Sequence, residues 1–166
     1  MSDLPSFDDV SALPAQFDET VQPDQIDENG HMNIRHYFGF ASWAVWKATE
    51  AAGVDQAYID ERGMSFFTVE QHLRYYGELR LGERFTVHSR LLERSGRAVH
   101  AMAFVLDQER EQLASTFELV YVHVDMAERK AVPIPEDVAK ALDADIADHD
   151  ALGWAAPVCG AMGVRR

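Results

Sequence analysis

The sequence predicts an α+β domain in which one antiparallel sheet packs against a single long helix. Two observations favour this class. A stretch of about 34–52 is apolar nearly all round with helical periodicity, and four strand-like segments with short connections follow it. Because a helix of that composition suits a position surrounded by other structure, we expect the sheet to wrap around it.

The elements before the strands are expected in a simple order. Residues 1–15 show little periodicity and are expected to form an N-terminal arm. A first strand is predicted over 16–22, although its Asp and Glu residues have low strand propensity. Residues 24–33 are rich in turn formers. The helix then begins near Ile34 and ends at Gly53, since glycine readily adopts the left-handed conformation that ends helices.

The rest of the domain is predicted to be a sheet followed by a short helix. Its strands are rich in aromatic and β-branched residues, and they cover 65–76, 83–94, 97–107 and 112–125. Short links make them an antiparallel meander. A short helix is predicted over 135–142, with a proline at its start. The domain is thus expected to span 16–142, followed by a C-terminal extension, 143–166, of unknown structure.

Composition and charge exclude several functions. The 166 residues fit one domain, and a hydrophobic fraction of 47% can form a core. A formal net charge of −13 argues against a nucleic-acid partner, which needs clustered Lys and Arg. No apolar run is long enough for a membrane span, and the acidic N-terminus does not resemble a signal peptide, so a cytoplasmic location is expected. The single cysteine, Cys159, excludes an internal disulfide and a Cys-rich metal site.

The stretch "DENGHMN", residues 27–33, contains the candidate catalytic groups. Asp27 can act as a general base or nucleophile, and Asn29 and His31 can hydrogen-bond or polarise a carbonyl. Unpaired N–H groups at the start of the helix could stabilise an oxyanion, and Gly30 would let the backbone approach a ligand. The alternative is structural, because Asn-Gly is a common turn dipeptide and Asn33 is a good helix N-cap.

The strand at 65–76 offers a second set of polar side chains. Regular alternation would place Glu70, His72 and Arg74 on one face of the sheet. One interpretation is a solvated face with alternating charges. The other is that Glu70 and His72 point into a pocket beside the start of the helix, with apolar walls from aromatic residues of the same strand.

These motifs resemble those of hotdog-fold acyl-CoA thioesterases, the superfamily of 4-hydroxybenzoyl-CoA thioesterase. The resemblance covers roughly 16–142 and rests on Asp27, Gly30 and Tyr37 in "DENGHMNIRHYF". The pattern D-x-N-x-H-x-N is also similar to that of plant acyl-carrier-protein thioesterases, except that Ile34 stands where their second Asn is usual. "NGHMN", "FTVEQHLRYYGELRLGE" and "LVYVHVD" together are most similar to the betainyl-CoA thioesterases of carnitine degradation.

The resemblance implies a hotdog fold, an antiparallel sheet wrapped around one long central helix, in a homodimer or homotetramer with active sites between subunits. It implies hydrolysis of an acyl-CoA, with CoA as part of the substrate and no metal or other cofactor. Catalysis would rest on Asp27, Asn29 and His31, with Asp27 as nucleophile or base. The backbone amides of Asn33 and Ile34 would form the oxyanion hole. The expected substrate-binding residues are Gly30, Met32, Tyr37, Glu70 and His72.

Two other functions compete with hydrolysis: a non-catalytic module that binds acyl thioesters, and a hotdog enoyl-CoA hydratase or dehydratase. An Asp at position 27 favours hydrolysis. A betainyl group would be recognised by aromatic faces and a counter-charge such as Glu70. The candidate aromatic walls are Trp43, Trp46, Phe66, Phe67, Tyr75 and Tyr76, and the candidate contacts to CoA phosphates are Arg35, Arg74, Arg94 and Arg97.

Overall fold

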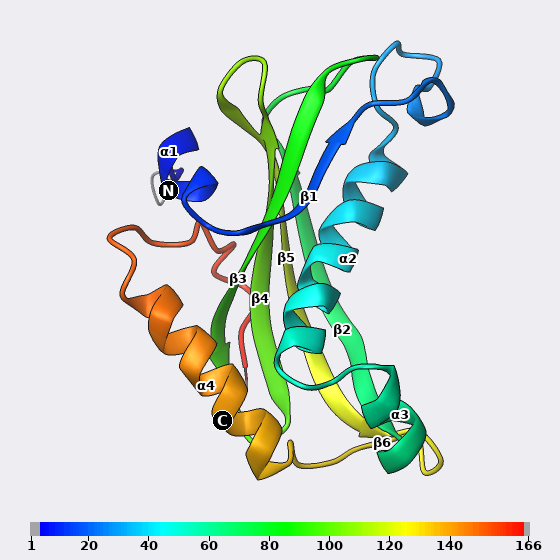
Figure 1. The fold of residues 1–166 in the computed structure, drawn as a ribbon, viewed down its shortest axis with the longest axis vertical. Helices are drawn as coiled ribbons and strands as arrows, with labels where there is room; N and C mark the ends of the chain where they lie inside the picture. The colour runs from blue at the N-terminus through cyan, green and yellow to red at the C-terminus, as the bar shows by residue number, and fades with distance from the viewer. Residues whose placement is uncertain (1–3, 165–166) are drawn as a thin grey trace.

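A computed structural model describes residues 4–164 and shows a curved antiparallel sheet packed along one long helix, α2 (Figure 1). The sheet order is β1-β3-β4-β5-β2, with β6 paired to β5. The strands are β1 Ala15–Thr20, β2 Met64–Tyr75, β3 Arg84–Arg94, β4 Ala98–Asp107, β5 Gln112–Asp125 and β6 Lys130–Ala131. The helices are α1 Phe7–Ser11, α2 Ile34–Ala51, α3 Gln56–Arg62 and α4 Glu136–Asp150, with a 3-10 turn at Pro23–Gln25. The predicted α+β hotdog architecture is confirmed.

Helix α2 forms where its periodicity predicts, and its start is capped by a side chain. The Asn33 carboxamide oxygen accepts a hydrogen bond from the Arg35 N–H at 3.1 Å, which satisfies one of the free donors of the first turn. Alanines on the inner stripe, such as Ala41 and Ala44, are fully buried and let the sheet approach closely. The opposite side corrects the expectation of a fully surrounded helix, because Ile34 and Trp43 are each 60% exposed.

The two faces of the sheet have different partners. Along the meander β3-β4-β5, alternate residues such as Ala103 and Phe117 join the large hydrophobic cluster under α2. Their neighbours, such as Met102 and Phe104, point to the outer face and pack with Val10 of α1 in a second, smaller cluster. The sheet therefore has an inner face that meets α2 and an outer face that meets the two ends of the described chain.

A β-bulge interrupts the alternation of β2. Thr68 pairs with Tyr121 and Glu70 pairs with the next residue, Val120, so Val69 is an extra residue in the ladder. Before the bulge, even-numbered side chains such as Phe66 face α2. After it, the odd-numbered ones do, as the packing of Leu73 against the inner cluster shows.

The bulge contradicts one of the two interpretations of this strand. Glu70, His72 and Arg74 are paired with Val120, Glu118 and Thr116, the residues of β5 that point away from α2. They therefore lie on the outer face of the sheet. Within one chain, Glu70 and His72 cannot enter a pocket beside the start of the helix.

Several elements are longer or more numerous than predicted. The N-terminal arm contains α1, which is held by a capping box between Ser6 and Asp9 and by the buried side chain of Val10. Helix α3 and the short strand β6 were not predicted. Helix α4 continues to Asp150, through an acidic sequence whose only large apolar residue, Ile146, packs against the core. Within residues 4–164, no helix has the length and hydrophobicity needed to cross a membrane.

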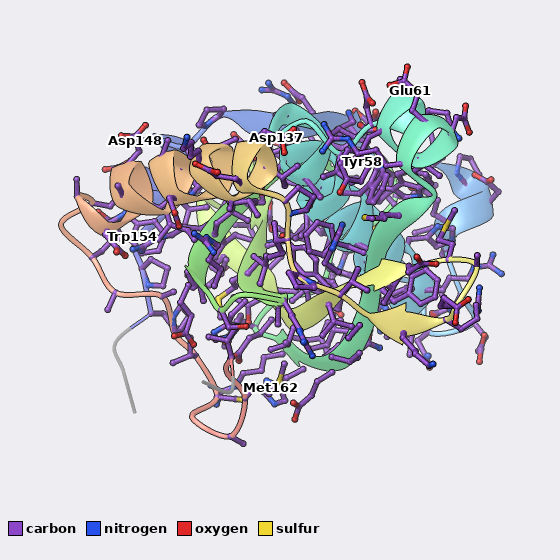
Figure 2. The ribbon with its side chains drawn as sticks, turned by 90° about the horizontal axis from the view of Figure 1, so that it is seen from below. Tyr58, Glu61, Asp137, Asp148, Trp154 and Met162 are labelled. Carbon is purple, nitrogen blue, oxygen red and sulfur yellow. The ribbon has the colours of Figure 1, made fainter. Side chains whose placement is uncertain are left out.

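The C-terminal segment after α4 runs back over the outer face of the sheet. The indole of Trp154 lies edge-on to Phe104 and under the guanidinium of Arg90, which is 4.5 Å from the ring centroid. Arg90 also donates hydrogen bonds to the backbone carbonyls of Trp154 and His149, at 2.8 and 2.7 Å. Figure 2 shows two points along this segment, Trp154 near the end of α4 and Met162 below the sheet. Residues 151–164 of the predicted extension thus run along the outer face of the sheet, whereas residues 143–150 continue α4.

Candidate active site

Residues 27–32 form a closed turn that fixes the backbone of Asp27. The Gly30 N–H donates to the Asp27 carbonyl at 3.0 Å, and the Asp27 N–H donates to the His31 carbonyl at 3.1 Å. Gly30 has a φ of +81°, a conformation that favours glycine. A bridge between Ile26 and Met32 closes the base of the turn. The structural interpretation of "DENGHMN" is therefore right, and the same turn positions the candidate catalytic groups.

The Asp27 carboxylate is held by two donors. One oxygen, Oδ1, accepts from the Asn29 N–H at 2.9 Å, and the other, Oδ2, accepts from the Asn33 side-chain amide at 3.2 Å. The His31 Nδ1 lies 3.9 Å from Oδ1. The Asp27 side chain is only 10% exposed, whereas that of His31 is 30% exposed. A nearly buried carboxylate with fixed orientation and a more accessible imidazole thus share one turn.

The start of α2 offers one of the two backbone donors that were predicted. The Asn33 N–H donates to the Gln25 carbonyl at 2.9 Å, so it is occupied. The Arg35 N–H is occupied by the Asn33 cap. Within the described residues the Ile34 N–H has no acceptor, as expected for the first residue of a helix. Ile34 is therefore the donor that the geometry leaves for an oxyanion.

A cavity of about 300 Å³ opens beside this helix start. It is lined by His31, Met32, Ile34 and Tyr37 on the helix side and by Tyr75, Tyr76, Gly77 and Glu78 at the end of β2. Through His31 the cavity adjoins Asp27. The predicted residues Met32 and Tyr37 are brought together here. Gly77 and Glu78 were not predicted, because the turn-rich link that carries them shows no signal of a site.

Tyr37 joins the two sides of this cavity. Its hydroxyl accepts a hydrogen bond from the Leu79 N–H at 2.8 Å, and the Leu79 carbonyl accepts one from the Met32 N–H at 2.7 Å. The ring lies edge-on to Tyr75, with centroids 5.4 Å apart. Burial raises the pKa of the Tyr37 hydroxyl to about 12, so it stays protonated near neutral pH. Tyr37 is a structural link and a wall of the cavity.

Most of the other predicted ligand contacts lie elsewhere. Glu70 and His72 are on the outer face of the sheet, and Phe66 is a core residue. Trp46 donates its indole N–H to Glu50 at 2.9 Å, on the far part of α2. Of the four arginines, Arg94 is held by two hydrogen bonds to Asp143.

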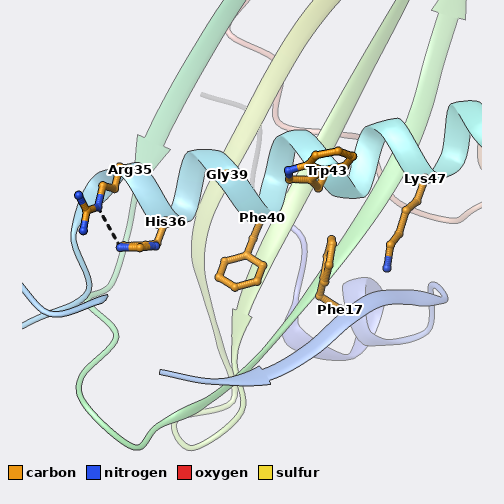
Figure 3. Close-up of a pocket in the computed structure, with 7 residues that line it drawn as sticks. All are labelled: Phe17, Arg35, His36, Gly39, Phe40, Trp43 and Lys47. Carbon is orange, nitrogen blue, oxygen red and sulfur yellow. Dashed lines mark hydrogen bonds between the residues drawn. The ribbon is translucent and has the colours of Figure 1, made fainter. Parts of the chain in front are cut away.

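A second and larger groove, of about 450 Å³, lies between α2 and β1 (Figure 3). Phe17, Phe40 and Trp43 line it, with Arg35 and Lys47 at its ends. Lys47 is already engaged there, with its Nζ 2.9 Å from the Gln16 carbonyl and 3.9 Å from the centre of the Phe17 ring. Among residues 4–164, no Asp or Glu lines this groove. It therefore offers no carboxylate base or nucleophile, whereas Asp27 lies next to the smaller cavity.

Comparisons with known proteins agree with this architecture. Residues 21–142 match the family model of the thioesterase-like superfamily. The chain is 35% identical over 133 residues to an L-carnitine dehydrogenase/betainyl-CoA thioesterase of Rhizobium meliloti, covering 78% of this chain and 26% of that protein. It therefore spans about a quarter of the length of that relative. It is also 26% identical to a betainyl-CoA thioesterase of Pseudomonas aeruginosa, covering 86% of this chain and 90% of that protein.

Solved structures show the same fold. A Staphylococcus aureus protein in complex with CoA superposes with a TM-score of 0.79 at 23% identity, covering 90% of this chain and 93% of that one. A 1,4-dihydroxy-2-naphthoyl-CoA thioesterase from Synechocystis superposes with a TM-score of 0.67 at 18% identity, covering 81% and 96%. At these identities the likeness establishes the fold.

Proposed function

Because this chain belongs to the thioesterase-like superfamily, we propose that it hydrolyses an acyl-CoA thioester and releases free CoA and a carboxylic acid. Membership confirms the predicted family and the class of enzyme, a hydrolase that acts on thioester bonds. The observation that carries the proposed activity is the Asp27 carboxylate, held by two hydrogen bonds next to a free helix N–H and a cavity. The test is release of a free thiol from acyl-CoA by the intact protein and by an Asp27 variant.

The proposed mechanism places the thioester carbonyl over the start of α2. The Ile34 N–H would donate to the oxygen as negative charge develops on it, an interaction typically worth about 3 kcal/mol in the transition state. We favour Asp27 as a general base, because its carboxylate lies behind His31 and does not line the cavity, which leaves room for a water between Asp27 and the thioester. The tetrahedral intermediate would then collapse with loss of the CoA thiolate.

In this scheme the attacking water is oriented by His31, the more accessible side chain of the turn. His31 lines the cavity and lies 3.9 Å from the carboxylate, so its imidazole can contact both the water and the substrate carbonyl. Asn29 supports Asp27 through its backbone N–H. The reaction as proposed uses side chains and backbone amides of the protein and needs no metal or organic cofactor.

We propose a betainyl-type acyl group as the substrate, on the basis of the relatives and of the cavity walls. Tyr37, Tyr75 and Tyr76 present aromatic rings to the cavity, and Glu78 adds a carboxylate. A trimethylammonium group is attracted to aromatic faces by roughly 0.5–2 kcal/mol per contact. The counter-charge is then Glu78, which replaces the predicted Glu70 on the outer face. Glu78 is also paired with Arg80.

The first prediction concerns selectivity for the cation. Betainyl-CoA is expected to have a kcat/KM at least ~10-fold higher than the neutral analogue in which carbon replaces the quaternary nitrogen, as one or two aromatic contacts would give. Tyr75→Leu should reduce this ratio by lowering turnover of the cationic substrate, while Phe67→Leu, at a residue that does not line the cavity, should keep it. Equal kcat/KM for the two substrates in the native protein would contradict a cation-selective pocket.

We also propose that the chain forms a homodimer, or a tetramer of two such dimers, through the edge of β2 and the neighbouring stripe of α2. Strand β2 is the last in the sheet order, so one of its edges is unpaired within the described residues. Ile34, Phe38, Val69 and Tyr75 are 60%, 40%, 59% and 45% exposed. Association of two subunits here would bury these exposed apolar side chains and cover the open edge of β2.

The second prediction tests this surface. Phe38→Glu places a charge in the middle of the proposed interface and is expected to convert the assembly to monomers, as measured by light scattering after size exclusion. Leu81→Glu is the matched control, because Leu81 is 58% exposed and belongs to the turn before β3, not to α2 or β2. Circular dichroism should show that both variants stay folded. An unchanged mass for Phe38→Glu would argue against this interface.

A further inference from the structure

A second group of reactive side chains lies on the outer face of the sheet, away from α2. It consists of His72 of β2, Glu118 of β5 and Cys159 of the C-terminal segment. One ligand atom of each, the imidazole nitrogen, a carboxylate oxygen and the thiol sulfur, lies within 4.8 Å of the other two. None of the three contributes to the cavity beside Asp27.

The sheet register creates the first half of this group. His72 and Glu118 are directly paired across β2 and β5, so their side chains stand side by side on the same face. This pairing depends on the bulge at Val69, which turns His72 to the outer face. Glu118 is only 1% exposed, although it is a carboxylate in the middle of a sheet.

Neighbouring groups fix Glu118 in place. The His100 Nε2 lies 2.9 Å from one carboxylate oxygen, and His100 is itself 3% exposed. The other oxygen accepts the backbone N–H of Cys159 at 2.8 Å. Partners of this kind orient the ligands of metal sites and tune their basicity.

The C-terminal segment brings the cysteine to this place through backbone hydrogen bonds. Besides the bond from the Cys159 N–H to Glu118, the Val164 N–H donates to the carboxylate of Glu93 at 3.2 Å. The segment is therefore attached to the sheet on both sides of its turn at Gly160, and the thiol is held over the His72–Glu118 pair. Residues around Cys159 have no helical or strand structure, so the thiol can shift without breaking a helix or a ladder.

We propose that His72, Glu118 and Cys159 bind a transition-metal ion of the zinc type. The combination of thiolate, imidazole and carboxylate matches zinc or cobalt, whereas magnesium and calcium prefer oxygen ligands alone. Metal bonds of about 2.0–2.3 Å in a tetrahedral site place ligand atoms about 3.5 Å apart. The side chains of His72 and Cys159, both partly exposed, would close the remaining distance, which is at most about 1.3 Å. The thiol proton passes to solvent as the sulfur–metal bond forms.

The bound ion would connect three segments that are remote in sequence. It would tie the C-terminal segment to β2 and β5, and it would leave a fourth coordination position for water. Because the metal binds the folded chain, it should raise the free energy of unfolding. The increase should grow with the logarithm of the ratio of metal concentration to dissociation constant. Its effect would be to stabilise the attachment of the C-terminal segment, on the face of the sheet opposite the proposed hydrolytic site.

The experiment uses the single cysteine as a reporter. Chelator-treated full-length protein is titrated with Co²⁺ while the thiolate-to-cobalt charge-transfer band is followed by absorbance. We expect a band that saturates at one equivalent, that Zn²⁺ abolishes by competition, and that is absent in Cys159→Ser and in His72→Ala. His36→Ala is the control, because His36 lies on α2 and outside the group.

A second measurement distinguishes the loss of metal binding from a folding defect in the variants. Zn²⁺ is expected to slow the reaction of Cys159 with an aromatic disulfide by about tenfold or more, since a metal-bound thiolate is less available. It should also raise the melting temperature of the native protein and of His36→Ala, but not of His72→Ala. The proposal is overturned if no band forms at stoichiometric Co²⁺, or if His72→Ala, shown to be folded by circular dichroism, retains the band and the protection.

Discussion

Replacing Asp27 by asparagine is expected to lower kcat for acyl-CoA hydrolysis by roughly 100- to 10,000-fold, the usual contribution of a positioned general base. Asparagine keeps the shape of the side chain, and its oxygen can still accept the Asn29 N–H that holds Asp27 at 2.9 Å. The amide cannot take a proton from water at neutral pH. The measurement is the steady-state rate of thiol release, with circular dichroism to show that the turn and helix are intact.

The control is Glu28→Gln, which removes the neighbouring carboxylate. Glu28 is exposed, and we expect near-normal turnover from this variant. Near-normal turnover from Asp27→Asn would instead refute the assignment of Asp27. If both Asp27→Asn and the native protein bound acyl-CoA but neither released thiol, the chain would be a binding module.

Isotope labelling of the native protein distinguishes the two roles of Asp27. Many turnovers in heavy-oxygen water would label the Asp27 carboxylate if it formed a mixed anhydride that water then attacked at the aspartyl carbon. A general base exchanges protons and keeps its oxygens. We expect no label in the peptide that contains Asp27, as read by mass spectrometry, and a labelled peptide would show that Asp27 is the nucleophile.

Replacing Tyr37 by alanine is expected to lower the free energy of unfolding by about 3–5 kcal/mol, the range for truncating a large aromatic residue in a core. Tyr37 is 3% exposed, packs edge-on against Tyr75, and accepts the Leu79 N–H. Tyr37→Phe keeps the ring but leaves that buried N–H without its acceptor, so a smaller loss of about 1–3 kcal/mol is expected. Urea unfolding measures both.

The matched control is Trp43→Ala on the same helix. Trp43 is 60% exposed, and substitutions at such positions usually change stability by less than about 0.5 kcal/mol. If Tyr37→Phe were as stable as the native protein, the hydrogen bond to Leu79 would not contribute, and Tyr37 would act through its ring alone. If Tyr37→Ala lost no more than Trp43→Ala, the described packing would be wrong.

The parts of this molecule that could be predicted are those whose cause is local in the sequence. The turn that holds Asp27 is made by residues within one short stretch, and the glycine and asparagines that shape it are visible there. Helix α2 and the strands β3 to β5 follow from apolar periodicity. The short helix α1 and the second half of α4 were missed, because each is stabilised by one or two apolar contacts, those of Val10 and Ile146, that a periodicity argument does not detect.

The parts that could not be predicted depend on pairing between distant segments. No glycine or proline marks the bulge at Val69, so regular alternation could show that Glu70 and His72 share a face but could not decide between the solvated face and the pocket. The cavity walls at 75–78 are brought to α2 by the same strand, and the meeting of His72 with Cys159 requires the path of the C-terminal segment. Each of these is decided by register and chain path, which a single sequence does not display.

The bulge in β2 marks a point of the chain where the ladder requires neither a particular residue nor the presence of the extra one. Any amino acid that tolerates the conformation of Val69 preserves the parity of the strand, so substitutions there should change little beyond the surface. Removing Val69 would join Thr68 directly to Glu70, and these two already pair with consecutive residues of β5, Tyr121 and Val120, so the ladder would become regular. Tyr75 would stay in the cavity and His72 would stay beside Glu118, so a one-residue deletion that an ordinary strand would not tolerate should leave both sites in place.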